Sequence, residues 1–165
     1  APDGRVWVTD CGNHRVVSYD ALLQDRKIVG RKGSGAGEFS SPTGICAAPS
    51  GAIYVADTGN KRIQVLAPDG TVRGEFAFPG WGENAEPHLA VDADGTIWAT
   101  DPPANAVLAL DPAGKLLKRI TEDGAGRTFA NPTGIAIDRK NRILYVVNSG
   151  NASIATIALS DRRTP

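Results

Sequence analysis

"GAIYVADTGNKRIQVLAPDGTVRGEF", residues 51–76, is the clearest of four related stretches in this 165-residue chain. The others are "GRVWVTDCGNHRVVSYD" at 4–20, "GTIWATDPPANAVLALDPAGKLLKRI" at 95–120 and "NRILYVVNSGNASIATIAL" at 141–159. Equivalent aromatic residues are spaced by 47, 44 and 47 positions, and they are Trp7, Tyr54, Trp98 and Tyr145. A period of this length indicates a repeat architecture in which each repeat is one supersecondary unit.

The second repeat predicts four short strands separated by turns. We expect strands a to d at 44–48, 53–56, 62–66 and 71–76, because β-branched and aromatic runs alternate with Gly, Pro, Asn and Asp. Between strands b and c, we expect Gly59 and Asn60 to supply the positive φ of a hairpin turn. Such units pack face to face as blades, about four to eight to a ring. The sequence therefore predicts an all-β protein, a β-propeller of four-stranded antiparallel blades with about four blades present.

The repeats extend over one domain, residues 1–165, and occupy approximately 1–43, 44–87, 88–133 and 134–165. The first repeat lacks a strand a and the last ends after strand c, so we expect three, four, four and three strands. This count predicts an incomplete ring and favours a contiguous fragment of a larger propeller, with a self-contained four-bladed ring as the alternative. The open blade edges of an incomplete ring would permit self-association.

Composition narrows the range of partners. Eighteen basic and eighteen acidic residues cancel, and neither sign forms a run of five or more, so we expect no nucleic-acid partner. No apolar stretch approaches the ~18 residues of a membrane span. The two cysteines, Cys11 and Cys46, are too few for a disulfide framework. We expect free thiols, with a bridge between neighbouring repeats as the alternative.

These motifs resemble those of the NHL-repeat β-propeller family, whose repeats combine a Pro-x-Gly start, an Ala-Asp-x-Gly-Asn turn and an Arg-Ile/Val strand. Residues 42–44 and 132–134 match the start, residues 56–60 match the turn, and Arg62 matches the strand. The resemblance covers nearly the whole chain. It implies a propeller that usually has six blades, and it leaves function open because propellers host unrelated activities. With a composition rich in Ala, Arg and Gly, it also favours an extracytoplasmic location.

An Asp–Arg pair flanks the turn in the first two repeats and decays afterwards. The third repeat has Ala106 at the Arg position, and the fourth loses both residues. We interpret the pair as a brace of the b–c hairpin, worth about 0.5–1 kcal/mol at a partly exposed position. The residues to which we assign this structural role are Asp10, Asn13, Arg15, Asp57, Asn60, Arg62, Asp101, Asn148 and Asn151.

His88 stands where the other two strand-a starts have Thr43 and Thr133, at the mouth of the predicted channel. In amidating lyases with NHL-like blades, histidines at such starts bind a catalytic zinc, so the resemblance makes His88 the one weak metal candidate. Zinc needs about three protein ligands, and His14 lies on a b–c turn farther from the axis. We therefore predict no metal site and interpret His88 as a polar residue at the channel mouth.

Two further features lie outside the repeated strands. Trp81 is either an exposed anchor for a partner or a residue packed onto its own blade. The glycine-rich stretch 33–37 is similar to a phosphate cradle, but no helix follows it, so we interpret it as the connection between strand d and the next strand a. Function is expected where the repeat is broken, at His88, at Trp81 or at the Pro102-Pro103 turn.

The sequence favours a non-catalytic binding or scaffold module that recognises a protein, peptide or glycan on the face built from the d–a and b–c loops. The candidate binding residues are His88, Trp81, Thr43, Thr133 and His14. We predict no cofactor. One alternative is part of a metal-dependent propeller enzyme, lyase-like or lactonase-like, with zinc or calcium in the channel. Another is a structural sensor or spacer domain.

Overall fold

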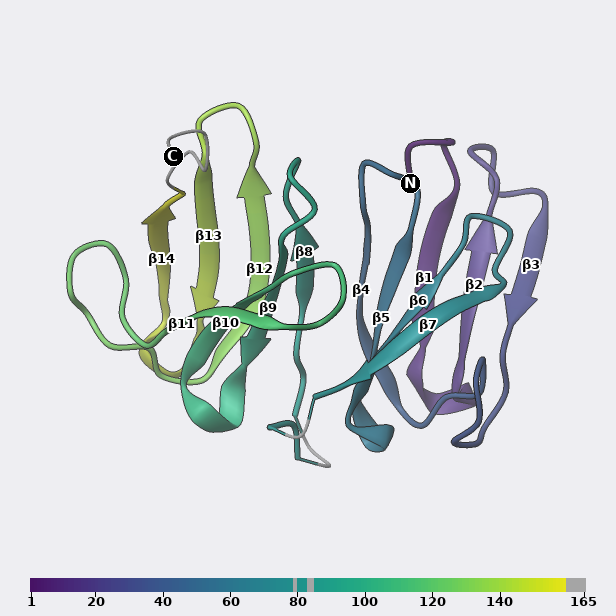
Figure 1. Cartoon of the computed structure of the whole chain (residues 1–165), viewed down its shortest axis with the longest axis horizontal. Coiled ribbons are helices and arrows are strands. Elements are labelled where there is room, and N and C mark those ends of the chain that lie inside the picture. The colour runs from purple at the N-terminus through teal and green to yellow at the C-terminus, as the bar shows by residue number, and fades with distance from the viewer. Residues whose placement is uncertain (79, 83–84, 160–165) are drawn as a thin grey trace.

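The chain folds into four antiparallel β-sheets that follow one another in sequence (Figure 1). The structure is a computed structural model that describes residues 1–78, 80–82 and 85–159. Its sheets contain three, four, four and three strands, so the all-β class and the expected strand count are confirmed. The helices among these residues are single 3-10 turns, and none has the length and hydropathy of a membrane span.

The strand bounds of the second sheet lie close to those expected. The first sheet has β1 (Val6–Asp10), β2 (Arg15–Tyr19) and β3 (Arg26–Val29). The second has β4 (Pro42–Ala47), β5 (Ile53–Asp57), β6 (Arg62–Leu66) and β7 (Val72–Ala77). The third has β8 (Leu89–Val91), β9 (Ile97–Asp101), β10 (Ala106–Leu110) and β11 (Leu116–Ile120). The fourth has β12 (Pro132–Asp138), β13 (Ile143–Asn148) and β14 (Ser153–Ala158).

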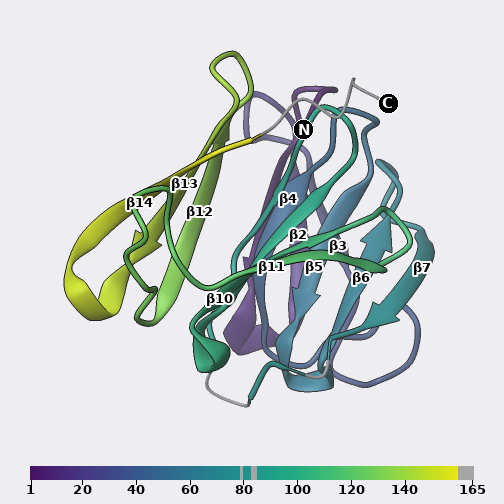
Figure 2. The same cartoon turned by 60° about the vertical axis from the view of Figure 1, so that its left-hand side comes forward.

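The sheets stand side by side in chain order, and the first strand of each sheet packs against the first strand of the next. Thus β1 packs beside β4, β4 beside β8, and β8 beside β12. Figure 2 shows the fourth sheet turned forward, with β14 outside β13 and β12. Hydrophobic clusters fill the spaces between neighbouring sheets. Ile53 and Phe39 belong to the cluster between the first two sheets, Ile63 and Ile97 to the next, and Leu144 to the last. Burial against both neighbours makes every residue of β5 and β9 buried.

Each b–c hairpin closes through a 3-10 turn followed by one residue in the left-handed conformation. The turns are η1 (Cys11–Asn13), η2 (Thr58–Asn60), η3 (Pro102–Ala104) and η4 (Ser149–Asn151). The expectation that Gly59 and Asn60 supply the positive φ is wrong, because the residue with positive φ, 53°, is Lys61. The Lys61 N–H donates to the Thr58 carbonyl at 3.0 Å and so closes the 3-10 turn. The turn lies between Asp57 and Arg62, the last residue pair of the two strands.

Gly59 is needed for space rather than for backbone conformation. A Cβ atom there would lie 2.8 Å from the Ser40 carbonyl oxygen, and the Gly59 N–H donates to that oxygen at 2.9 Å. Gly150 makes the same approach to Ala130, with an N–H to carbonyl distance of 2.8 Å. These contacts attach two of the b–c turns to the connections that precede their sheets. The third turn has Pro103 at this place, which offers no N–H.

Candidate functional site

One end of the four sheets, called the loop face below, gathers the connections between sheets and the 3-10 turns (lower edge of Figure 1). The connections are residues 30–41, 78–88 and 121–131, of which 79, 83 and 84 lie outside the described residues. Strand d of one sheet and strand a of the next meet at this end because each four-stranded sheet returns the chain to the end where it began. The candidate residues from the sequence lie at or near this end.

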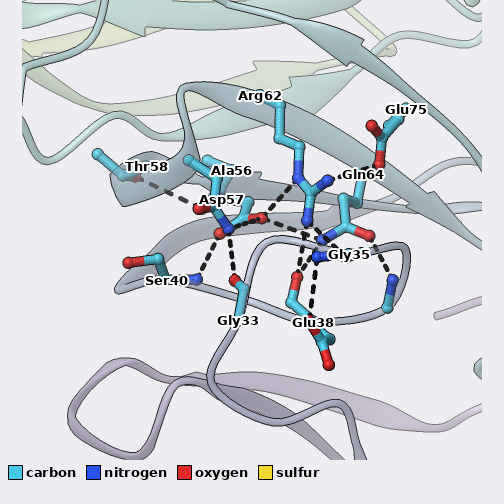
Figure 3. Close-up of polar contacts among 12 residues, drawn as sticks. Gly33, Gly35, Glu38, Ser40, Ala56, Asp57, Thr58, Arg62, Gln64 and Glu75 are labelled. Carbon is cyan, nitrogen blue, oxygen red and sulfur yellow. Dashed lines mark hydrogen bonds and ion pairs between the residues drawn. The ribbon is translucent and has the colours of Figure 1, made fainter.

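Asp57 is the centre of a buried polar network in the second sheet (Figure 3). Its Oδ1 accepts the Ser40 N–H at 2.7 Å. Its Oδ2 accepts hydrogen bonds from Asn60 Nδ2 at 2.9 Å, Arg62 Nε at 2.8 Å and Gln64 Nε2 at 3.0 Å. The expectation of a partly exposed pair is wrong here, because the Asp57 and Arg62 side chains are 0% and 10% exposed. The carboxylate is stabilised by four donors at once.

The side chains of Arg62 and Gln64 also form hydrogen bonds with the β3–β4 connection and hold it against the b–c hairpin (Figure 3). Arg62 Nη2 donates to the carbonyls of Gly35 and Glu38 at 2.8 and 2.9 Å. Gln64 Nε2 donates to the Glu38 carbonyl at 2.6 Å, and its Oε1 accepts the Gly37 N–H at 2.9 Å. The glycine-rich stretch 33–37 is therefore the connection between sheets that we expected. The Gly35 carbonyl within this stretch and the Glu38 carbonyl directly after it accept hydrogen bonds from the buried guanidinium of Arg62.

The first sheet contains the same pair closer to solvent. Arg15 Nε donates to Asp10 Oδ2 at 2.8 Å, with side chains 30% and 27% exposed. Asn13 Nδ2 donates to Asp10 Oδ1 at 2.9 Å. These hydrogen bonds, that of Arg15 foremost, hold the pKa of the Asp10 carboxyl below its ordinary value.

The fourth sheet keeps one contact of the network with a neutral side chain. Asn148 Oδ1 accepts the Ala130 N–H at 2.6 Å, as Asp57 accepts that of Ser40. Asn151, the last residue of η4, contacts the strand that follows it, because its Oδ1 accepts the hydroxyl of Ser153 in β14 at 3.2 Å. An amide is sufficient in a sheet that has no arginine to neutralise.

The third sheet keeps the acid and loses its partners. Asp101 is 4% exposed, and its Oδ1 has no hydrogen-bond partner among the described residues. Ala106 stands at the arginine position, opposite Asp101 in the strand register. The amide equivalent to that of Ser40 belongs to Ala85, and it donates to the Gly82 carbonyl at 3.0 Å. Burial raises the pKa of the Asp101 carboxyl.

Trp81 anchors the connection before the third sheet by aromatic packing. Its side chain is 0% exposed, and its indole Nε1 donates to the Thr100 carbonyl at 3.2 Å. Its ring stacks on Phe78, with ring centroids 4.0 Å apart. The exposed-anchor alternative is therefore wrong, and Trp81 belongs to the core between the second and third sheets.

The three strand-a starts present polar side chains on the loop face. Thr133 Oγ1 lies 2.6 Å from the exposed Ser149 hydroxyl, and the Thr43 hydroxyl lies 2.7 Å from that of Thr58. The His88 ring is exposed, with Nδ1 3.2 Å from the carbonyl of Glu86. Since β8 and β12 are neighbours, His88 and Thr133 begin adjacent inner strands.

His14 joins the first two sheets. Its Nδ1 accepts the Ser41 N–H at 3.0 Å, just before the second strand-a start. Asn105, at the equivalent left-handed position of the third sheet, accepts the Asn131 N–H at 2.7 Å. Sequence reasoning missed this link, although a side-chain acceptor directly after the turn in both repeats is a signal for it. The Nδ1 atom of His14 is therefore occupied by a structural hydrogen bond.

Among the described residues, no three His, Cys, Asp or Glu side chains lie close enough to hold a metal ion. His88 alone supplies one of the about three ligands of a catalytic zinc, so these residues do not by themselves fit that metal. Both cysteines are free thiols. Burial raises the pKa of the Cys46 thiol to about 12, which makes it unreactive.

Comparison with known protein families identifies the repeats. The NHL repeat profile matches residues 1–19 and 39–66, which contain the two Asp–Arg pairs. The chain contains NHL repeats. Protein brain tumor of Drosophila melanogaster is a relative with 27% identity over 117 residues, which cover 67% of this chain and 11% of that protein.

Other similarities are to proteins with enzyme names. A gluconolactonase of Zymomonas mobilis is 31% identical over 137 residues, which cover 72% of this NHL-repeat chain and 37% of the gluconolactonase. A catalytically inactive His-to-Ala variant of virginiamycin B lyase from Staphylococcus aureus, solved with quinupristin, superposes with a TM-score of 0.68 and 20% identity. It covers 99% of this chain, which spans about half, 54%, of the lyase chain. The fold is that of a β-propeller.

Proposed function

We propose that this NHL-repeat chain is a non-catalytic recognition module whose loop face binds a protein, peptide or glycan. The observation that carries the proposal is the row of uncharged polar groups on adjacent inner strands. His88 is followed on the next sheet by the paired hydroxyls of Thr133 and Ser149. Hydroxyl and imidazole groups both donate and accept hydrogen bonds, as the peptide group and sugar hydroxyls of such ligands require.

Rigid connections support this role. The Asp57 network fixes the β3–β4 connection, and Asn148 and Asn105 fix the β11–β12 connection through the amides of Ala130 and Asn131. Groups held in place before a ligand arrives lose less conformational entropy on binding. A surface of this kind favours recognition of one ligand geometry.

The test compares three forms of the protein on peptide and glycan arrays and in titrations with the strongest ligand found. The His88→Ala/Thr133→Val variant removes the imidazole and one of the two paired hydroxyls, and Lys140→Ala removes an exposed charge at the opposite end of the sheets. We expect the double variant to weaken binding at least about tenfold, ~1.4 kcal/mol, at unchanged stability, and Lys140→Ala to leave it intact. Equal binding by all three forms would refute a loop-face site.

The second candidate is part of a propeller enzyme, favoured by the identity to a gluconolactonase and by the exposed His88 ring. Calorimetric titration with zinc and with calcium, together with a gluconolactone hydrolysis assay, separates it from a binding module. Stoichiometric metal binding and turnover that are both lost in His88→Ala would favour the enzyme. Ligand capture that persists in the presence of a chelator would favour the recognition module.

A further inference from the structure

The strongest unexplained feature is the buried carboxylate of Asp101, whose Oδ1 has no hydrogen-bond partner among the described residues. A buried acceptor without a partner is energetically unfavourable. The equivalent Asp57 has four donors, so the position itself does not require an unsatisfied oxygen. Four substitutions in the third sheet account for the difference, and the first is Ala104 at the place of Asn60.

The strand registers of the two sheets match. Asp101 pairs with Ala106 as Asp57 pairs with Arg62, and Ala99 pairs with Leu108 as Val55 pairs with Gln64. The third sheet therefore has methyl and isobutyl groups where the second has a guanidinium and an amide. Pro103 stands at the place of Gly59 and cannot bring the preceding connection close. The three side-chain donors and the loop amide that Asp57 has are therefore absent from Asp101, which keeps a backbone hydrogen bond from Ala104.

A cavity of about 210 Å³ occupies this part of the third sheet. Its lining includes Phe78, Gly80, Asp101, Leu108, Leu110 and Leu116. Leu116 is 52% exposed and Gly80 is exposed, so the cavity opens to solvent along the side of the sheet. The acid stands among apolar walls, which is the environment of a long side chain with an aliphatic stem and a cationic head.

We propose that this cavity binds an arginine side chain of a partner polypeptide, with the guanidinium on Asp101 and the stem along Leu108 and Leu110. The second sheet gives the reason for arginine, because there the chain's own Arg62 places a guanidinium on the equivalent carboxylate at 2.8 Å. A planar fork of donors matches a carboxylate better than the point charge of a lysine. The lining of the cavity includes Phe78 and Gly80 of the 78–88 connection but none of His88, Thr133 and Ser149, so the two proposals can fail independently.

Arg119 is the charged neighbour that such a ligand meets. Its Nη2 donates to the Ala104 carbonyl at 3.2 Å, and its charge lowers the pKa of Asp101 against the larger effect of burial. These contacts also identify Arg119 as a side chain of this chain that could compete with the partner's arginine for Asp101. A rotation of the Arg119 side chain would bring its guanidinium toward the carboxylate. The experiment must therefore distinguish a partner's arginine from Arg119.

The test is a titration followed by backbone amide shifts of Ala104, Ala106 and Leu108. The probes are a short Gly/Ala peptide with one central arginine, the same peptide with citrulline, which is neutral and isosteric, the same peptide with lysine, and free arginine. We expect saturable shifts with the arginine peptide, at least about tenfold weaker binding of the citrulline peptide, and intermediate binding of the lysine peptide.

Four variants complete the test. Asp101→Asn removes the charge, and Ala106→Arg supplies a guanidinium from the residue opposite Asp101 in the strand register. Arg119→Gln removes the competitor, and Glu122→Gln removes an exposed charge as the matched control. We expect the first two to lose the shifts, the third to bind as well or better, and the control to bind like the parent. Binding that survives Ala106→Arg, binding of free arginine but not of the peptide, or binding that appears first in Arg119→Gln would each overturn the proposal.

Discussion

The second and third sheets solve one structural problem in two ways. Each must hold the connection that precedes it against its own b–c hairpin. The second sheet does so with polar contacts centred on Asp57, and Arg62 reaches the carbonyls of the connection. The third sheet does so with Trp81, whose indole is buried and bonded to the Thr100 carbonyl. Because the aromatic solution needs no acid, Asp101 is left without its donors and becomes available to a ligand.

The largest effect should come from removing the polar centre. We expect Asp57→Ala to lower the free energy of unfolding by about 3–5 kcal/mol, because it breaks the buried ion pair with Arg62 and leaves the donors of Asn60 and Gln64 without their acceptor. The carboxylate that remains at Arg62 is that of the half-exposed Glu75, 2.8 Å from Nη1. Urea unfolding followed by tryptophan fluorescence measures it. Asp10→Ala, which removes the same pair near solvent, is the control and should cost much less. Equal losses in the two variants would show that burial of the network contributes nothing.

The next effect comes from the close approach of the hairpin to the connection. Gly59→Ala places a Cβ 2.8 Å from the Ser40 carbonyl oxygen and should cost about 1–3 kcal/mol. Gly12→Ala is the matched control, because nothing lies within 4 Å of its Cβ position and its φ is not positive. We expect that control to be neutral or slightly stabilising. A shift of the urea midpoint in Gly12→Ala as large as in Gly59→Ala would contradict this account.

Local pattern was sufficient to predict the strands, because each is bounded by Gly, Pro, Asn or Asp and rich in β-branched residues. The pairing of Asp57 with Arg62 was also predictable from their spacing in two repeats. The burial of that pair was not, since it depends on a connection from the preceding repeat folding over it. Burial is a property of two repeats together, and the pattern within one repeat does not contain it.

The third repeat shows a different limit. Ala106 and Pro103 were visible as departures from the motif, and we interpreted the loss of arginine as decay of a brace. In space the same loss leaves a cavity beside a buried acid. For Trp81 the sequence left two alternatives, an exposed anchor or packing onto its own blade, because the residue falls outside the repeated strands. The structure buries it in the core between the second and third sheets.

A smaller effect should follow from neutralising the unpartnered acid. We expect Asp101→Asn to raise the free energy of unfolding by up to about 1 kcal/mol at pH 7, since the charged form is buried with the backbone hydrogen bond of Ala104 but without the side-chain donors that Asp57 has. The native pKa is raised above the ordinary 3.8, so the penalty is fully present above the native pKa. It falls as pH drops through that value, and the advantage of the variant should shrink with it. Unfolding at several pH values, with Glu122→Gln as control, checks the sign; a constant advantage would be inconsistent with a raised pKa.

The smallest effect should come from giving the third sheet the arginine of the second. Ala106→Arg places a guanidinium opposite Asp101 in the strand register, and Asp101 lines a cavity of about 210 Å³ beside it. The gain should be about 0.5–1 kcal/mol, because the new side chain loses rotamer freedom and finds no Gln64 equivalent beside it. The double variant Ala106→Arg/Asp101→Asn is the decisive control. If the stabilisation arises from the pair, it disappears in the double variant; if it persists, the arginine acts through its stem alone and the two sheets differ in packing rather than in charge.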